Sequence, residues 1–368
     1  MNETTWLVGA ALVTPAGLRR GAVAVHQGRI AAIRTSAPRG GRRIELRGRT
    51  LAPGFIDLHV WGEPEVVARA AVKGGTTSFL TAVGPQSPEL LVNRLVQLSN
   101  QLHSQLGTRN SELRGARCLG VHLEGPFLNP LKAGALASRW LRPPTSGELR
   151  QLVRYANGQL KLVTMAPEMP RALETIRWCA RHGIVVSLGH TDADAAIAQR
   201  AIRAGAKAVT HIFNGMRSLH HRDPGLLGEA LTDDRLMAMV ILDGVHVDPR
   251  AFQLLWRCKG ARGIVLTTDS IRHQEHPHAA KGGAFYTSKG ILAGSRLTMI
   301  RAVQNAVRFG RAPLADAVRM AGANPAKLLG LDDDVGSLAV GQRADLVAFD
   351  RNFRVHMTFV NGEAVYQR

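Results

Sequence analysis

The sequence predicts an α/β protein, namely a TIM (β/α)8 barrel with a small β-sandwich domain built from both termini. This prediction rests on the chain length, on apolar runs that alternate with helical stretches in the middle, and on strand-like patterns at both ends. The 368 residues fit one barrel of about 250 residues and one compact additional unit. Hydrophobic residues make up 45% and charged residues 20%, which is typical of a globular protein with a sizeable core.

The middle of the chain contains short apolar runs that indicate parallel strands buried on both faces, each followed by a helical stretch. The eight runs are Gly54 to Val60, Thr76 to Val83, Cys118 to Glu124, Leu162 to Ala166, Ile184 to Leu188, Ala208 to Phe213, Met237 to Asp243 and Ile264 to Asp269. Such alternation is typical of a (β/α)8 barrel, although the first two runs leave little room for a helix between them.

Both ends of the chain have the pattern of short strands separated by turns. The expected strands lie at residues 6–8, 22–25, 29–33, 43–46, 344–349 and 355–360, the last followed by an Asn-Gly turn. We therefore expect residues 1–50 and 338–368 to form one small β-sandwich domain. Residues 51–337 would form the barrel.

The formal net charge of +19 is the unusual feature of the composition. A basic surface attracts the phosphates of nucleic acids, but here the arginines are spread along the whole chain. The sequence has no basic tail, no zinc-finger spacing and no aromatic RNA-binding motif. We interpret the charge as solvated basic faces and expect no nucleic-acid partner.

No apolar run reaches the roughly 18 residues needed to span a bilayer, and the N-terminus lacks the basic stretch of a secretory signal. These features predict a cytoplasmic protein without a membrane partner. The three cysteines, Cys118, Cys179 and Cys258, are far apart and form no CxxC pair. We expect them to be buried as small apolar residues.

Polar residues collect where the predicted barrel strands end, and this is the face at which barrels of this class carry their active sites. The residues at these ends are His59, Glu124, His190, His211, Asp243 with nearby His246, and Asp269. Histidines and carboxylates are the donors that divalent metals such as zinc bind. Their concentration at one rim predicts a metal-dependent active site.

Glu124, His190 and His211 can supply three ligands and leave a fourth position for water, which the metal would acidify towards pH 7. Asp269 could accept a proton from that water and return it to a leaving nitrogen. Each residue alone also has an ordinary structural interpretation. A histidine can be a satisfied core or surface residue, Glu124 can cap the segment that follows it, and Asp269 can be a helix N-cap.

Several stretches of the chain match one known family in family order. They are Leu51 to Asp57, Gly120 to Asn129, Gly189 to Thr191, Thr210 to Met216, Asp243 to Val247, Thr268 with Asp269, Leu292 to Ser295, and Leu297 to Met299. With these motifs the sequence strongly resembles the N-acetylglucosamine-6-phosphate deacetylases of the amidohydrolase superfamily.

The resemblance implies removal of the acetyl group from N-acetyl-D-glucosamine 6-phosphate, with Glu124, His190 and His211 as metal ligands and Asp269 as general base and acid. It implies one divalent ion per subunit, Zn2+ with Fe2+, Mn2+ or Co2+ as alternatives. The substrate-binding residues would be Ala135, Asn214, Gly215, Arg222, His246, Leu292, Ala293 and Gly294. Arg222 matches an arginine that grips the phosphate across the interface of a homodimer, and a guanidinium suits that task.

The sequence departs from the family pattern at Trp61 and Leu136. Many amidohydrolases have His-x-His after the first strand, but here Trp61 follows His59 and Val60. We therefore expect a single metal ion, with His59 either a weak extra ligand or without a metal role. At Leu136 the family usually has a histidine that orients or polarises the acetyl carbonyl, so the chain lacks that donor.

Three further histidines, His273, His276 and His278, are close together in sequence and are expected in a mobile loop over the site. The two departures keep other functions open. One is a deacetylase for N-acetylgalactosamine 6-phosphate or another amide within the superfamily. The other is a non-catalytic descendant that binds a sugar phosphate or nucleic acid.

Overall fold

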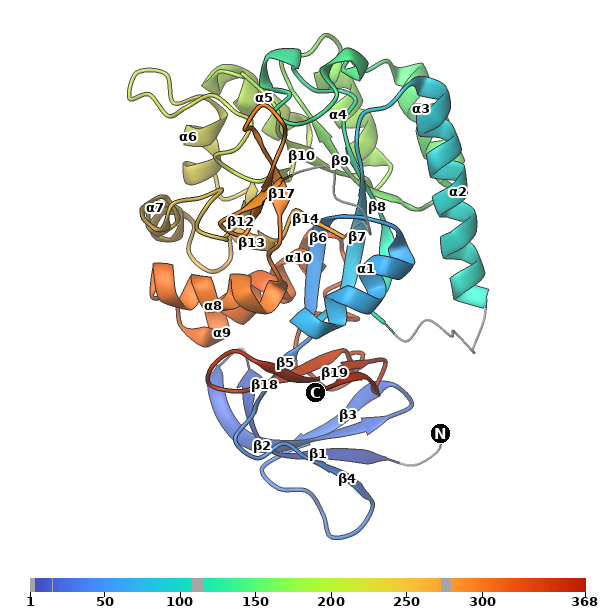
Figure 1. Ribbon diagram of the computed structural model, residues 1–368, viewed down its shortest axis with the longest axis vertical. Helices are drawn as coiled ribbons and strands as arrows, with labels where there is room; N and C mark the ends of the chain where they lie inside the picture. Colours follow the sequence, from blue (N-terminus) through green and yellow to red (C-terminus); the bar gives the residue numbers. More distant parts are fainter. Residues whose placement is uncertain (1–3, 15, 108–114, 273–278) are drawn as a thin grey trace.

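The computed structural model describes residues 4–14, 16–107, 115–272 and 279–368 (Figure 1). Two sheets organise the chain, one of twelve strands that forms the barrel and one of eight strands built from both ends of the chain. In Figure 1 the barrel occupies the upper part, and the strands from both ends of the chain form the small sheet below it.

The barrel strands follow the predicted runs in order, and each pairs in parallel with the next. They are β6 (Phe55–Trp61), β7 (Thr76–Val83), β8 (Arg117–Glu124), β9 (Leu160–Met165), β10 (Val185–Leu188), β11 (Ala208–Val209), β12 (Met237–Ile241) and β13 (Ile264–Thr267). The strand expected over residues 208–213 ends four residues early. It ends because His211 and Phe213 have φ of +30° and +79°, which extended strands do not allow.

Helices surround the barrel on its outside (Figure 1). One of them, α9, contacts both the barrel strand β13 and strand β1 of the small sheet. They are α1 (Pro64–Ala71), α2 (Pro88–Gly107), α3 (Ser146–Ala156), α4 (Ala172–Arg181), α5 (Ala195–Ala204), α6 (Gly225–Thr232), α7 (Pro249–Lys259), α8 (Met299–Gly310), α9 (Leu314–Ala321) and α10 (Ala323–Leu328). The short α1 and one 3-10 turn fill the narrow space between β6 and β7. Caps fix several starts, as where the Asp194 carboxylate accepts from the Ile197 N–H at 2.7 Å.

The barrel closes between its first and eighth strands through the buried carboxylate of Asp57. Its Oδ1 accepts from the Thr267 hydroxyl at 2.9 Å and from the Thr268 backbone N–H at 3.1 Å. Burial raises the pKa of Asp57, and the bonds from Thr268 and Thr267 oppose that rise. Just beyond, the Asp269 N–H donates to the His59 carbonyl at 2.9 Å. Two residues of the predicted active site are therefore hydrogen-bonded to each other next to the place where the barrel closes.

After β13 the chain extends the barrel sheet with a hairpin that stands at its mouth. The added strands are β14 (Ser270–Ile271), β15 (Ala279–Lys281), β16 (Ala284–Tyr286) and β17 (Leu292–Ser295). β14 pairs with both β6 and β17, which brings residues 292–294 to the active-site side.

The small sheet has the strand order β20-β19-β18-β5-β1-β2-β3, with β4 parallel to β1. Its strands are β1 (Thr5–Thr14), β2 (Gly17–His26), β3 (Arg29–Arg34), β4 (Arg42–Glu45), β5 (Thr50–Pro53), β18 (Leu346–Phe349), β19 (Val355–Val360) and β20 (Glu363–Gln367). Buried side chains from both chain ends, such as Leu12, Ile30 and Phe359, share one core. Val13 and Phe349 pack in the barrel cluster instead, so the division into domains at residues 50 and 338 remains our proposal.

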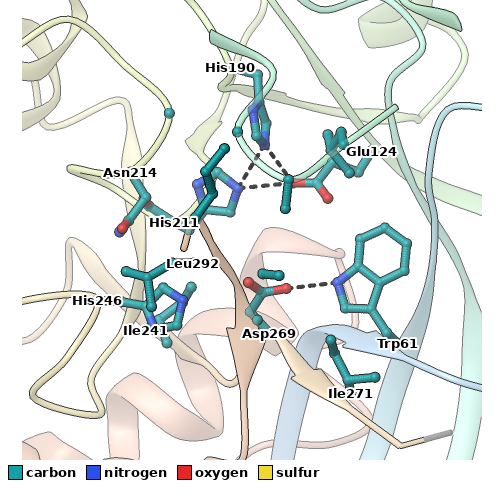
Figure 2. Close-up of a pocket in the computed structure, with 17 residues that line it drawn as sticks. Trp61, Glu124, His190, His211, Asn214, Ile241, His246, Asp269, Ile271 and Leu292 are labelled. Atoms are coloured by element: carbon teal, nitrogen blue, oxygen red, sulfur yellow. Dashed lines mark hydrogen bonds and ion pairs between the residues drawn. The ribbon is translucent and has the colours of Figure 1, made fainter. Parts of the chain in front are cut away.

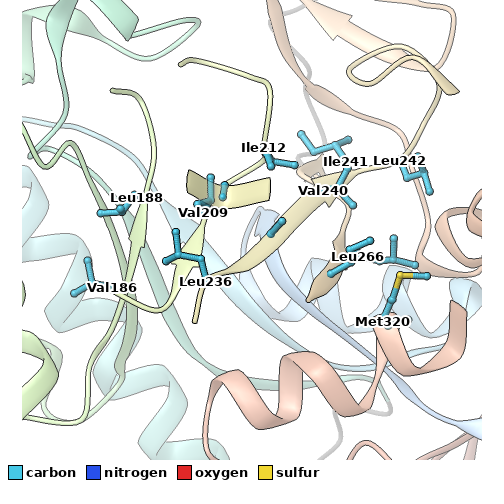
Figure 3. Close-up of a cluster of buried hydrophobic side chains, with 14 of the residues drawn as sticks. Val186, Leu188, Val209, Ile212, Leu236, Val240, Ile241, Leu242, Leu266 and Met320 are labelled. Carbon is cyan, nitrogen blue, oxygen red and sulfur yellow. The ribbon is translucent and has the colours of Figure 1, made fainter. Parts of the chain in front are cut away.

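The main apolar core lies between the barrel strands and the outer helices (Figure 3). Val186, Val240 and Leu266 come from the strands and Met320 from α9, and all four are fully buried. Inside the barrel the packing is partly polar, because the Thr164 hydroxyl bonds to the Thr210 hydroxyl at 2.8 Å. The strands are therefore buried on both faces, as the continuous apolar runs predicted.

Cys179 is buried as expected, whereas Cys118 is half-buried and Cys258 is exposed. The expectation was wrong for Cys258 because this residue faces outward from α7. His273, His276 and His278 lie outside the described residues. Within the described ranges, none of the helices combines the length and the apolar character needed to cross a membrane.

Replacing Asp57 with alanine is expected to lower the free energy of unfolding by about 3 kcal/mol, since it leaves buried donors on Thr267 and Thr268 without an acceptor. Urea unfolding of the parent and of Asp57→Ala would measure the loss. Asp57→Asn keeps one acceptor oxygen and should lose less. Equal stability of the alanine variant and the parent would contradict the closure role.

Candidate active site

A pocket of about 350 Å³ opens at the C-terminal ends of the barrel strands (Figure 2). It is lined by Trp61, Glu124, Gly134, Ala135, Leu136, His190, His211, Asn214, Gly215, Ile241, His246, Asp269, Ile271, Ile291, Leu292, Ala293 and Gly294. The structure thus brings the expected metal ligands, the expected general base and most of the expected substrate residues into one cavity.

Glu124, His190 and His211 converge from three strands. Glu124 ends β8, His190 follows β10, and His211 follows β11. Glu124 Oε1 lies 3.2 Å from His190 Nε2 and 2.9 Å from His211 Nε2, and the two Nε2 atoms are 3.2 Å apart. All three side chains are buried, so bulk water does not separate these polar atoms.

Unusual backbone conformations aim the side chains at the pocket. His190, His211 and Asp269 have φ of +49°, +30° and +48°, in or near the left-handed region that non-glycine residues rarely adopt. Strain of this kind costs on the order of 1–3 kcal/mol per residue and is typical of functional sites. Here it turns each side chain out of the strand direction and into the pocket, where His190 and His211 meet Glu124.

The donor set fits a divalent metal ion. The Nδ1–H of His190 donates to the Lys132 carbonyl at 2.7 Å, so in the neutral ring Nε2, which lies next to Glu124, would be the nitrogen that offers its lone pair to a metal. His211 Nδ1 is buried without a hydrogen-bond partner among the described residues. A carboxylate oxygen and two imidazole nitrogens this close together form a favourable arrangement when a cation lies between them.

The electrostatics of the cluster agree with a cation site. Burial raises the pKa of Glu124, but His59 and the bonds from His190 and His211 outweigh it and hold this pKa well below its usual range. Burial lowers the pKa of His190, yet its contact with Glu124 leaves the pKa raised. The negative centre therefore attracts protons, and a metal ion would take their place.

His59 is fully buried between two carboxylates rather than within the three-donor group. Its Nε2 lies 3.2 Å from Asp269 Oδ1 and 3.5 Å from Glu124 Oε2. Burial lowers the pKa of His59, but both carboxylates raise it above the usual value. Its Nδ1 lies 2.8 Å from His122 Nδ1, which orients the ring from behind. The candidate metal group in the described ranges comprises Glu124, His190 and His211 alone.

Asp269 stands across the pocket from the two histidines, where Trp61 contacts it (Figure 2). The indole Nε1–H of Trp61 donates to Asp269 Oδ1 at 2.7 Å. Trp61 thus occupies the position of the missing second imidazole and faces the proposed base. Leu136 also lines the pocket, so both departures from the family pattern lie in its wall.

Asn214, Gly215 and His246 line the pocket, as do Ala135 and residues 292–294. The His246 Nδ1–H donates to Asp243 Oδ2 at 2.7 Å, which fixes the ring and leaves Nε2 for a ligand. The pKa of Asp243 is lowered although burial raises it, because its bonds with His246 outweigh burial.

Arg222 is the exception among the expected substrate residues. It is exposed, lies outside the pocket lining of the single chain, and contacts His221 Nε2 through Nη1 at 3.0 Å. Its assignment to the phosphate therefore depends on a second subunit.

Reasoning from the sequence missed two buried polar residues that support the site. His122 lies inside β8, where its Nε2 bonds to the Thr164 hydroxyl at 2.7 Å, and Asp57 lies inside β6. A polar residue within an otherwise apolar run was the available signal for both. The apolar walls formed by Ile241, Ile271 and Ile291 carried no signal of their own.

The chain matches the Amidohydrolase family over residues 50–365. It is 32% identical to the N-acetylglucosamine-6-phosphate deacetylase of Bacillus subtilis, covering 100% of this chain and 98% of that protein. It is 35% identical to the N-acetylgalactosamine-6-phosphate deacetylase of Escherichia coli O157:H7, covering 87% and 88%. The chain therefore belongs to the amidohydrolase family of hydrolases.

Similarity to solved structures narrows the assignment. A variant of the Mycobacterium smegmatis N-acetyl-D-glucosamine-6-phosphate deacetylase, solved in complex with N-acetyl-D-glucosamine-6-phosphate, has a TM-score of 0.90 at 29% identity over 100% of both chains. Together with the similarity to the Bacillus subtilis protein, this confirms the predicted fold and the expected place in the N-acetylglucosamine-6-phosphate deacetylase family.

Purified protein is expected to carry about one divalent ion per chain, and Glu124→Gln should lose it, because a neutral amide cannot balance the cation. Elemental analysis after dialysis would measure the stoichiometry. His103→Ala is the matched control, since this exposed histidine on α2 lies outside the pocket. Full metal content in Glu124→Gln would rule out the assigned ligand set.

Proposed function

We propose that this protein hydrolyses N-acetyl-D-glucosamine 6-phosphate to D-glucosamine 6-phosphate and acetate. The observation that carries the proposal is the convergence of Glu124, His190 and His211 beside Asp269 in one pocket. Three neutral or anionic donors and a nearby carboxylate are the parts that metal-assisted amide hydrolysis requires. The relatives named above supply the substrate class.

Glu124, His190 and His211 would hold one divalent ion, for which we propose Zn2+, with Fe2+, Mn2+ or Co2+ as alternatives. When bound there, such an ion supplies Lewis acidity for the acetyl carbonyl and for a water molecule. His59 lies on the far side of Glu124, against Asp269, and we assign it an orienting contact.

Asp269 would act as the general base and acid. Its carboxylate lies at the pocket surface with 13% of the side chain exposed, so it can reach both solvent and substrate. It takes a proton from the attacking water and then gives a proton to the amine nitrogen as the C–N bond breaks. One carboxylate can perform both transfers because the proton it gains in the first is the proton it returns in the second.

The sugar phosphate calls for a cation that the described lining of the pocket does not supply. Among the described residues that line the pocket, none is a lysine or an arginine. His246 and backbone amides at Asn214 and Gly215 can donate hydrogen bonds, but a dianion favours a guanidinium. We propose that Arg222 of a second subunit completes the site in a homodimer.

Leu136 has consequences for rate rather than for the type of reaction. Since a leucine cannot donate a hydrogen bond to the carbonyl, a divalent ion bound by Glu124, His190 and His211 would have to supply that polarisation. Loss of one such donor typically costs on the order of 100-fold in rate, which leaves substantial catalysis. The charged substrate also suits the cytoplasmic location that the sequence predicts, since sugar phosphates do not cross apolar bilayers unaided.

The second candidate function is deacetylation of N-acetylgalactosamine 6-phosphate. It is favoured by the 35% identity to the Escherichia coli O157:H7 protein of that name, similar to the identity with the glucosamine-specific relatives. The two sugars differ only in the orientation of one hydroxyl group, which the apolar walls of this pocket give little means to distinguish.

Replacing Asp269 with asparagine is expected to abolish acetate release while the metal content stays unchanged, because the amide can neither accept nor return the proton. Acetate assays and elemental analysis on the same preparation would test both points. Near-normal turnover by Asp269→Asn would refute the general-base role.

A panel of N-acetyl sugars with and without a 6-phosphate would test the substrate class. We expect the phosphorylated sugars to be preferred by at least about 10-fold in kcat/KM and Arg222→Ala to remove most of that preference through KM. Arg319→Ala on the outer face of the barrel serves as the charge-matched control. Equal activity on the unphosphorylated sugars would overturn the assignment of Arg222.

A further inference from the structure

We infer that Trp61 is a positioning residue that holds the Asp269 carboxylate in its reactive orientation. The inference rests on the proposed role of Asp269 as general base. Nothing in the sequence motif suggests it, because tryptophan stands where other amidohydrolases place a metal ligand. The structure assigns this side chain a different task in the same place.

Trp61 holds one oxygen of the carboxylate and leaves the other free. Its Nε1–H donates to Asp269 Oδ1 at 2.7 Å, and His59 Nε2 lies 3.2 Å from the same oxygen. Among the hydrogen bonds of the described residues, none reaches Asp269 Oδ2. The carboxylate is therefore anchored through Oδ1, and Oδ2 is left to take the proton.

Only the side chain of Asp269 can still rotate, because its backbone is hydrogen-bonded on both sides. Its N–H donates to the His59 carbonyl at 2.9 Å, and its carbonyl accepts from the Ser295 N–H at 2.8 Å. The φ of +48° is held by these bonds. Without the indole, the carboxylate could rotate about its side-chain torsions and point Oδ2 away from the substrate.

An indole suits this task because its N–H is a donor only. It cannot take the proton that Asp269 has to move, and it cannot ligate a metal ion that would compete for the same carboxylate. Histidine in this place could do both. Trp61 therefore gives Asp269 an anchor that does not take part in the proton transfer.

The indole is itself held in place by Gly84 and Leu136. A Cβ atom on Gly84 would lie 3.0 Å from Trp61 Cη2, 3.2 Å from Cζ3 and 3.7 Å from Leu136 Cδ2. The missing side chain at Gly84 thus creates the space that the ring occupies, and Leu136 borders the same space. Both departures from the family pattern therefore lie around Gly84 and line the same pocket as the proposed base.

The decisive variant is Trp61→Phe, which keeps an aromatic ring and removes the N–H. We expect kcat to fall about 10- to 100-fold with KM changed less than about 2-fold and the metal content unchanged, since small misplacement of a catalytic group has costs of this size. Trp178→Phe, on the outer helix α4, is the matched control and should keep parental kcat. Parental kcat in Trp61→Phe would overturn the inference.

A second variant perturbs the anchor from Gly84, which does not itself line the pocket. Gly84 does not have a left-handed φ, so Gly84→Ala acts mainly by displacing the indole. It should lower kcat in the same direction as Trp61→Phe, by a smaller factor. If Gly84→Ala and Trp61→Phe both keep the parental kcat, two separate variants contradict the positioning role of Trp61.

Nuclear magnetic resonance gives a readout that does not require turnover. The chain has five tryptophans, and Trp61→Phe identifies the indole N–H signal of Trp61 in protein labelled with 15N-tryptophan. Asp269→Asn should move that signal upfield, because an amide oxygen is a weaker acceptor than a carboxylate. An unmoved signal would show that the hydrogen bond does not form.

The outcomes separate this inference from the proposed function. Full activity of Asp269→Asn would remove the general-base role on which the inference rests. An inactive Asp269→Asn variant beside a fully active Trp61→Phe variant would remove the inference alone.

Discussion

The site depends on a carboxylate that is buried where water cannot solvate it. An isolated ionised carboxylate in a protein interior is strongly unfavourable, so Glu124 requires positive partners at close range. His59 lies within 3.5 Å of it from β6, and a cation held by Glu124, His190 and His211 would complete the balance. Because the partners come from different strands, the charge balance of the rim depends on correct strand order and on closure at Asp57. The donor set is therefore complete only when the barrel is closed.

The backbone carries the strain that this arrangement requires. His190, His211 and Asp269 all have positive φ, and each directly follows a barrel strand. An exposed loop would relax such conformations, but here the adjacent strands are hydrogen-bonded on both sides and packed between two cores. The rigid barrel therefore stabilises these unfavourable backbone conformations. This is a physical reason why active-site residues lie at strand ends.

Much of the fold could be predicted because strands buried on both faces leave continuous apolar runs in the sequence, and strand polarity then places their polar ends at one rim. The short β11 could not be predicted, since the apolar Ile212 and Phe213 continue the run past the bend at His211. The contact between Trp61 and Asp269 joins residues 208 positions apart, and no local pattern encodes it. Cys258 was misjudged because residue type alone does not reveal which side of a helix faces solvent.

The charges of the described pocket residues bear on how a phosphorylated substrate would be held. A divalent ion would offset the carboxylates of Glu124 and Asp269, and among the described residues that line the pocket none is a lysine or an arginine that could pair with a phosphate dianion. The net charge of +19 raises the potential over the whole surface, but such a field is screened by salt and favours encounter rather than orientation. A specific hold on the phosphate requires a cation within hydrogen-bonding distance. Since the described walls of the pocket are largely apolar, in our proposal that cation comes from a neighbouring copy of the chain, where the exposed Arg222 is available.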